Sequence, residues 1–190
     1  MNLSKQCSFE LPDWIGDFLD GWTMPLTTIS RRMQLAIALS AENVRQGTGG
    51  PFAAVVINEE TRELVAVGVN LVISAGLSAA HAEIVALSLA QTAVNNWNLA
   101  DAGTLQLVTT CEPCAMCYGA VPWSGVKSLV CGAGQRDAEA AGFDEGEKPA
   151  DWVKSLQQRG IVVQCGVLSE EAAAVLADYK DSGGTIYNAD

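Results

Sequence analysis

The sequence predicts an α/β fold in which five strands alternate with about five helices. Short β-type apolar runs are interleaved with segments whose apolar residues recur at the helical period, which is the pattern of a layered α/β domain. No internal repeat or linker rich in Gly, Pro or Ser divides the 190 residues, a length typical of one domain. We therefore expect a single domain at residues 31–190, with a lead-in at residues 1–30 that packs on it.

The first half of the domain contains two predicted helices and a pair of strands. Residues 31–46 carry apolar side chains close to the helical period and end at a glycine, which is typical of a helix. The apolar runs at 52–57 and 64–73 are joined by a short polar turn and predict an antiparallel pair. Residues 78–93 form the clearest helix, since the hydroxyl of Ser78 can cap its first turn.

The second half continues the alternation. A buried-type strand at 104–110 leads into a helix from about Pro113 to Trp123, because proline suits a first turn whose N–H has no partner. The residues at 137–149 are interpreted as an acidic loop. Trp97 and Trp123 are assigned to the core. The remaining predicted elements are a strand at 127–131, a helix at 150–158, a strand at 161–165 and a helix at 169–180.

Composition excludes several classes of protein. The chain has 11 basic and 22 acidic residues, a formal net charge of −11 and a pI near 4.4. So acidic a surface repels phosphate backbones, and we expect no nucleic-acid partner. Polar and small residues interrupt the most apolar segment, 64–80, so we expect no membrane span. The start lacks the basic and apolar pattern of a signal peptide, which indicates a cytoplasmic protein.

The chemistry of the chain centres on its single histidine and a crowded group of cysteines. His81 lies at the start of a predicted helix, and Cys114 and Cys117 are three residues apart on one face of another. Both cysteines are near a helix N-terminus, which favours thiolate over thiol. Two thiolates and an imidazole supply three ligands of a tetrahedral zinc ion. The fourth position stays open, as in catalytic rather than structural zinc sites.

Glu83 is two residues from His81 and is a poor fourth ligand. Positions two apart on a helix point about 200° from each other, so both side chains reach one site only over the helix end. A closed four-cysteine zinc site would need a second cysteine pair, and the other cysteines are scattered. A thioredoxin-like redox site would leave His81 and Glu83 without a role. The joint pattern therefore favours a catalytic zinc site.

The pattern His81-Ala82-Glu83 followed by Pro113-Cys114-Ala115-Met116-Cys117 is that of zinc-dependent base deaminases. Over roughly residues 30–187 the chain resembles the cytidine and deoxycytidylate deaminase superfamily, and within it the bacterial guanine deaminases. The segments that carry the closer resemblance are Gly49-Gly50-Pro51-Phe52-Ala53, Asn70, Cys111-Glu112, Gly142-Phe143-Asp144-Glu145-Gly146 and Ile186-Tyr187-Asn188.

This resemblance implies a cytidine-deaminase-like, three-layer α/β/α fold with a mixed five-stranded sheet. It implies one zinc ion per chain, held by His81, Cys114 and Cys117. The implied reaction is hydrolysis of a cyclic amidine C–N bond, converting guanine, a small purine base, to xanthine and ammonia. Glu83 is expected to carry protons between water and the ring. A homodimer is also implied, with a C-terminal segment that can be exchanged between subunits.

The resemblance also assigns further site residues. Glu145 matches the acidic residue that delivers a proton to the leaving group, with Asp144 and Glu147 as neighbours that remain open and a solvated acidic loop as the alternative. The residues expected at the substrate are Asn70 on the ring edge, Phe52 on the ring face, Ala82 within the zinc motif and Tyr187 at the mouth of the pocket. For Asn70 the alternative is a cap on its own backbone, for Phe52 core packing, and for Tyr187 an exposed tail.

Other functions share these motifs. The ring that is deaminated could instead be guanosine, cytosine or a triazine of the ammeline type. Deamination of adenosine in transfer RNA requires a basic surface, which the charge of −11 argues against. A riboflavin-pathway deaminase would carry a second catalytic domain. Outside the enzymes, the alternative is an inactive interaction protein that zinc stabilises, although zinc binding alone does not require Glu83.

Overall fold

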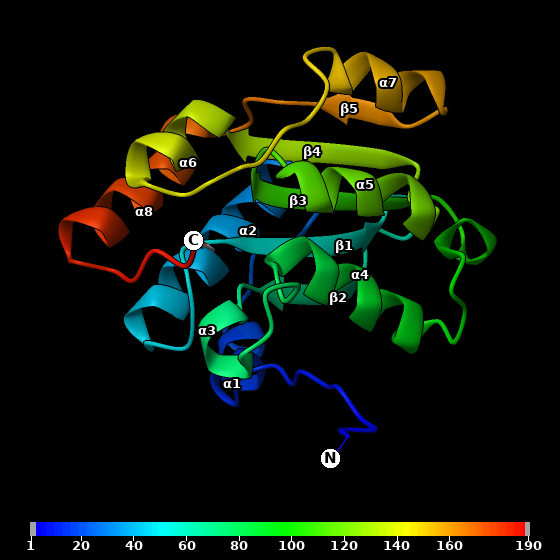
Figure 1. Cartoon of the computed structure of the whole chain (residues 1–190). Coiled ribbons are helices and arrows are strands. Elements are labelled where there is room, and N and C mark those ends of the chain that lie inside the picture. The colour runs from blue at the N-terminus through cyan, green and yellow to red at the C-terminus, as the bar shows by residue number, and fades with distance from the viewer. Residues whose placement is uncertain (1–2, 189–190) are drawn as a thin grey trace.

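The computed structural model describes residues 3–188, so residues 1–2 and 189–190 of the expected domain lie outside the described residues. Its centre is a mixed five-stranded sheet of order β2-β1-β3-β4-β5 (Figure 1). β1 is antiparallel to both of its neighbours, whereas β3, β4 and β5 are parallel. The strands are β1 (Ala53–Asn58), β2 (Leu64–Val69), β3 (Leu105–Cys111), β4 (Ser128–Ala133) and β5 (Val162–Gln164).

Helices cover both faces of this sheet, which confirms the predicted three-layer α/β/α architecture (Figure 1). Those that pack on one face are α4 (Ala82–Ala93), α5 (Ala115–Ser124) and α7 (Trp152–Gln158). Those on the other are α1 (Trp14–Asp20), α2 (Ile29–Arg45) and α8 (Ser169–Asp181). Shorter elements are α3 (Val72–Ala75), the 3-10 helix η1 (Leu99–Ala102) and α6 (Gln135–Ala141).

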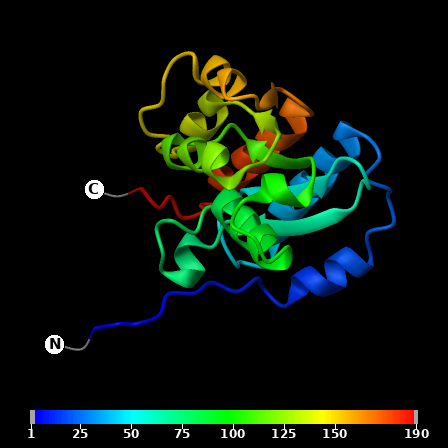
Figure 2. The same ribbon diagram turned by 90° about the vertical axis from the view of Figure 1, so that its right-hand side faces the viewer.

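The N-terminal segment runs along the outside of the domain to α1, with residues 3–8 exposed (Figure 2). Ile15 of α1 is 4% exposed and belongs to the same core cluster as Met33 of α2. Phe9 and Leu11, which precede α1, pack on this cluster. Among residues 3–188, no helix combines the length and the apolarity that a membrane crossing needs.

The end of β2 and the start of α4 both differ from the prediction. β2 ends at Val69, and the chain then forms the short α3 instead of continuing as a strand. Helix α4 begins at Ala82, with His81 as its N-cap residue, so the prediction that Ser78 caps this helix is wrong. The cause is tertiary: the N–H of Leu71 donates to the carbonyl of Ala80 at 2.9 Å, which holds the preceding residues out of the helix.

The segments on either side of β4 also differ from the prediction. Pro113 precedes α5, whose N-cap is Cys114, so it does not occupy the first turn. Helix α6 occupies part of the predicted acidic loop; the Asp137 carboxylate accepts from the N–H of Gly134 at 2.8 Å and stabilises its start. Trp97 and Trp123 are 75% and 80% exposed, so their assignment to the core is wrong.

A close approach between α4 and β2 fixes the position of the helix that follows His81. A Cβ atom on Gly68 of β2 would lie 2.2 Å from the carbonyl oxygen of Ala82 and 2.4 Å from the backbone nitrogen of Ala86. Only glycine therefore lets the first turn of α4 rest directly on the sheet.

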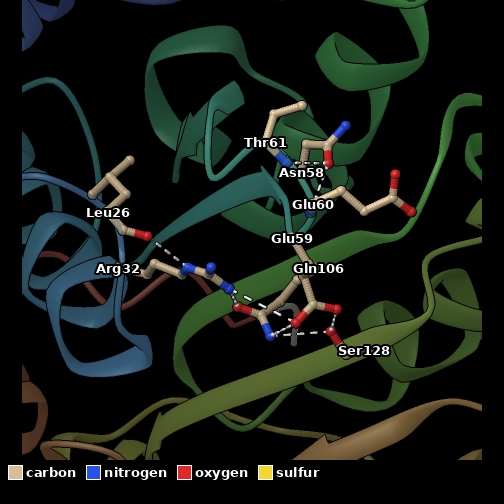
Figure 3. A network of polar contacts seen from close by, with 8 residues as sticks. All are labelled: Leu26, Arg32, Asn58, Glu59, Glu60, Thr61, Gln106 and Ser128. Atoms are coloured by element: carbon tan, nitrogen blue, oxygen red, sulfur yellow. Dashed lines mark hydrogen bonds and ion pairs between the residues drawn. The ribbon is translucent and has the colours of Figure 1, made fainter.

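A buried polar network lies at the end of the sheet opposite to Cys111 and the start of α5 (Figure 3). The Arg32 guanidinium donates to the Leu26 carbonyl at 3.0 Å and to Gln106 at 2.8 Å, and it lies 3.8 Å from the Glu59 carboxylate. Gln106 and Ser128 both donate to Glu59. The network joins α2, the turn after β1, β3 and β4, so its role here is structural.

Candidate active site

Three potential zinc ligands meet where α4 and α5 begin. His81 occupies the N-cap position of α4, Cys114 occupies that of α5, and Cys117 follows one turn later on the same face. Their ligand atoms lie within 4.8 Å of one another, and Cys114 Sγ is 3.5 Å from His81 Nδ1. A sulfur ligand about 2.3 Å and a nitrogen ligand about 2.0 Å from a tetrahedral zinc ion are about 3.5 Å from each other. The donor set therefore fits zinc in both chemistry and spacing.

The two cysteines differ in how readily they become thiolate ligands. The pKa of Cys114 is lowered to about 4, mainly because the Cys117 thiol donates a hydrogen bond to it, although burial opposes this effect. The same hydrogen bond and burial raise the pKa of Cys117, which keeps the shared proton. Zinc binding requires the loss of that proton, because the thiolate is the ligand.

Glu83 lies in the first turn of α4, is 6% exposed and lines the same pocket as His81. His81 has an extended backbone, with φ −68° and ψ 152°, so it stands before the helix and not within it. This geometry lets side chains two residues apart face one pocket. Burial, and then the negative charge of Cys114, raise the pKa of Glu83, as expected for a carboxylate that exchanges protons.

The pocket beside the ligands is small, with a cavity volume of about 200 Å³. Pockets for drug-sized ligands hold about 300–1,000 Å³, so this one suits a single base better than a nucleotide. Four of the residues expected at the substrate or in proton transfer line it together with Glu83: Phe52, Asn70, Glu145 and Tyr187. Ala82 does not line it, because its side chain is buried in the core between α4 and the sheet.

Glu145 brings a second carboxylate into the pocket from the loop after α6. It is 6% exposed, and within residues 3–188 its Oε2 atom is buried without a hydrogen-bond partner. Burial, and then the charge of Cys114, raise its pKa to about 8. The sequence left Asp144 and Glu147 as alternatives for this proton-transfer role. Asp144 lines the pocket, but it is exposed and its carboxylate accepts a hydrogen bond from the N–H of Gly146. Glu147 is exposed and does not line the pocket.

Asn70 combines the two roles that the sequence left as alternatives. Its Oδ1 accepts from the N–H of Val72 at 3.2 Å, which is a local backbone turn. The residue is 1% exposed and lines the pocket, and in the described part of the chain its Nδ2 donates to no protein group. The local hydrogen bond therefore fixes the amide so that its donor is available to a ligand.

Aromatic side chains form one wall of the pocket. The rings of Phe52 and Phe143 are 4.9 Å apart between centroids, and those of Phe143 and Tyr187 are 5.1 Å apart. The Tyr187 hydroxyl is buried and has no partner among the described residues. Asn188 holds this tail in place through hydrogen bonds of 3.0 Å to the Gly142 carbonyl and to the N–H of Asp144.

Phe143 lines the pocket as well, although its place in the Gly142–Gly146 segment predicts no role for it. The available signal was its position two residues before Glu145, which brings its ring to the same pocket. A histidine and two cysteines that fit zinc, with a buried glutamate beside them at a base-sized pocket, define the class of zinc-dependent hydrolytic deaminases.

Comparisons with known proteins agree with this class of zinc-dependent deaminases. The family described as the cytidine and deoxycytidylate deaminase zinc-binding region matches residues 26–133, and the chain belongs to this family. It is 36% identical over 125 residues to the guanine deaminase of Bacillus subtilis, covering 63% of this chain and 77% of that protein. The tRNA-specific adenosine deaminase of Haemophilus influenzae is 32% identical over 134 residues, covering 68% and 70%.

Solved structures are similar over almost the whole chain. A structure of the guanine deaminase from Nitrosomonas europaea has 40% identity and a TM-score of 0.87, covering 95% of this chain and all of that one. A structure in complex with 2,6-diaminopurine has 43% identity and a TM-score of 0.87, covering 95% and 96%. These similarities confirm the expected family, fold and zinc-dependent chemistry, whereas the roles of individual residues stay predictions.

Proposed function

We propose that the protein is a zinc-dependent guanine deaminase that hydrolyses guanine to xanthine and ammonia. The observation that carries this proposal is the second carboxylate: Glu145 presents an unpartnered oxygen to the pocket that Glu83 also lines, beside the zinc ligands. Similarity to guanine deaminases along most of the chain supports the choice of substrate.

His81, Cys114 and Cys117 would hold the zinc ion, which would supply the means to form a nucleophile at neutral pH, since zinc lowers the pKa of water toward about 7. Glu83 accepts a proton from the attacking water and donates it to a ring nitrogen of guanine. This transfer makes the carbon that bears the amino group electrophilic, and the water oxygen adds to it. The C–N bond then breaks, the oxygen remains on the ring as a carbonyl, and the proton of the added hydroxyl replaces the one that Glu145 gives to the amine.

Glu145 supplies the proton that the leaving group requires, because ammonia leaves far more readily than amide ion. Its raised pKa of about 8 lets the carboxyl group hold a proton near neutral pH. The two carboxylates thus have different roles: Glu83 carries a proton from water to the ring, and Glu145 protonates the amine.

Recognition of the base rests on two polar groups, one of Asn70 and one of Tyr187, and on aromatic faces. Asn70 offers its free amide N–H to an acceptor on the purine edge. Phe52 and Phe143 provide apolar faces for a planar ring, and the hydroxyl of Tyr187 can reach a polar group of the base. The small cavity supports a base over guanosine, and the net charge of −11 disfavours transfer RNA.

We also propose that the protein acts as a homodimer in the cytoplasm. Helix α5 exposes the large apolar side chains of Met116 and Trp123, and Trp97 is exposed in the segment that follows α4. Exposed apolar patches of this kind are typical of subunit interfaces. The tail with Tyr187 lines the pocket of its own chain, and in a dimer the same segment could be exchanged to line that of the partner. All six cysteines are free, which supports a reducing compartment.

The proposal is tested by comparing Glu145→Gln with Glu147→Gln, which makes the same change two residues away at an exposed position. We expect Glu145→Gln to lower kcat on guanine about 100-fold or more, because glutamine carries no transferable proton. Glu147→Gln should leave kcat unchanged. Xanthine formation is followed by its ultraviolet spectrum. Equal activity of the two variants, or no xanthine from the wild-type protein, would contradict the proposal.

A further inference from the structure

Lys148 is a buried lysine whose polar contacts lie at the zinc-binding turn, residues 112–114, which joins β3 to α5. Its side chain is only 3% exposed, and its Nζ donates to the carbonyl of Pro113 at 2.8 Å. The same nitrogen lies 3.8 Å from the Glu112 carboxylate and 5.0 Å from the centroid of the Trp152 ring. A buried ammonium is costly unless it is paired, so these contacts fix the position of the side chain firmly.

The carbonyl that Lys148 binds belongs to the residue immediately before the zinc ligand Cys114. Pro113 closes the turn between β3 and α5, and its carbonyl has no role in the hydrogen bonds of α5, which begins at Ala115. The ammonium of Lys148 gives this carbonyl a charge-assisted donor. Any shift of the turn would move Cys114 Sγ directly.

Lys148 is also three residues from Glu145, on the same loop. Two other contacts bind this loop to the start of α5: the N–H of Ala115 donates to the Glu145 carbonyl at 2.9 Å, and Gly146 lies tightly against Ala115. Gly146 has φ +66°, and a Cβ atom there would lie 3.0 Å from that of Ala115. The loop and the zinc-binding turn therefore form one packed unit. Among the hydrogen bonds of residues 3–188, that of Lys148 is the only one in which a side chain of this loop donates to the turn.

We propose that Lys148 is a positioning residue that holds the loop carrying Glu145 against the turn carrying Cys114, and so sets both zinc retention and the placement of the second carboxylate. The part of this inference that concerns Glu145 rests on the proposed function, whereas the part that concerns Cys114 rests on zinc binding alone.

The test compares Lys148→Met with Lys180→Met. Methionine keeps the apolar stem over Trp152 but removes the charge and the donors. Lys180 is a matched control, because its Nζ also donates to a backbone carbonyl, that of Ala140 at 2.6 Å, but it is exposed on α8 and does not line the pocket. The readouts are the rate of zinc release to the coloured chelator 4-(2-pyridylazo)resorcinol at 25 °C, kcat and KM on guanine, and the unfolding midpoint.

We expect Lys148→Met to release zinc faster and to lower kcat, each about 10- to 100-fold, as is usual when a group that orients a metal ligand is removed. KM should change little, because Lys148 does not line the pocket. Lys148→Arg, which keeps the charge and the donors, should restore most of both rates, and Lys180→Met should match the wild type. If Lys148→Met does not fold, Lys148→Gln, whose amide is too short to reach Pro113, takes its place with the same expectations.

The inference is overturned if a folded Lys148→Met or Lys148→Gln releases zinc at the wild-type rate, or if only its unfolding midpoint falls. It is also overturned if Lys180→Met shows the same losses. A wild-type protein that does not deaminate guanine would refute the proposed function and the role toward Glu145. The rate of zinc release would then still decide the role of Lys148 toward Cys114.

Discussion

Replacement of Glu83 by glutamine isolates the proton-transfer role of this residue. The side chain is 6% exposed, lines the pocket beside His81, and keeps its size in Glu83→Gln while losing its capacity to accept and return a proton. General acid–base catalysis contributes about 10²- to 10⁴-fold, which corresponds to about 2.7–5.4 kcal/mol of activation free energy. We expect kcat on guanine to fall by this factor.

The same variant should keep its zinc, since the ligand atoms come from His81, Cys114 and Cys117. The burial that raises the pKa of Glu83 disfavours the charged form, so removing the charge should not lower the unfolding midpoint. Steady-state ammonia release, zinc content by atomic absorption and thermal unfolding are measured together. Glu170→Gln, in the first turn of α8, is the matched control and should behave as the wild type. The reasoning is refuted if Glu83→Gln retains kcat within tenfold of the wild type, or if it loses zinc, because Glu83 would then be a ligand.

Two further changes test recognition and the fold. Asn70→Ala should lower kcat/KM on guanine about tenfold, because the net free energy of one hydrogen bond corresponds to about this factor. An unchanged kcat/KM would mean that Asn70 only stabilises the turn to Val72. Arg32→Met should lower the free energy of unfolding by about 3 kcal/mol, measured by urea denaturation, because it leaves Glu59 and Gln106 without their buried partner. It should leave kcat on guanine unchanged, since this network lies at the other end of the sheet, and a matching loss of kcat would show that the two ends are coupled.

The zinc ligands could be predicted because their signal is local. Cys114 and Cys117 are one helical turn apart, and His81 lies at the start of another helix, so sequence spacing alone places each group. Glu83 follows from the same motif. The order and type of most elements were predictable for a similar reason, since the antiparallel pairing of β1 with β2 follows from the short turn between them.

Boundaries and distant contacts could not be predicted in the same way. Ser78 is a good local cap, but the pairing of Leu71 with Ala80 outweighs it and moves the start of α4 to Ala82. The acidic residues around α6 favoured the prediction of a loop, whereas the hydrogen bond from the N–H of Gly134 to the Asp137 carboxylate stabilises the start of a helix there. The contact between Lys148 and Pro113 joins residues 35 positions apart, and no spacing in the sequence records it.

The most direct test of the central claim is to measure ammonia release by the zinc-loaded wild-type protein from guanine, guanosine, cytosine, cytidine, adenine and ammeline, with product spectra. The two carboxylates, the amide of Asn70 and the small cavity predict xanthine from guanine, with little or no product from the nucleosides. Activity confined to a nucleoside or a pyrimidine would contradict guanine as the substrate while leaving the zinc site in place. No ammonia from any of the six, with one zinc ion bound per chain, would contradict the assignment as an enzyme acting on these rings.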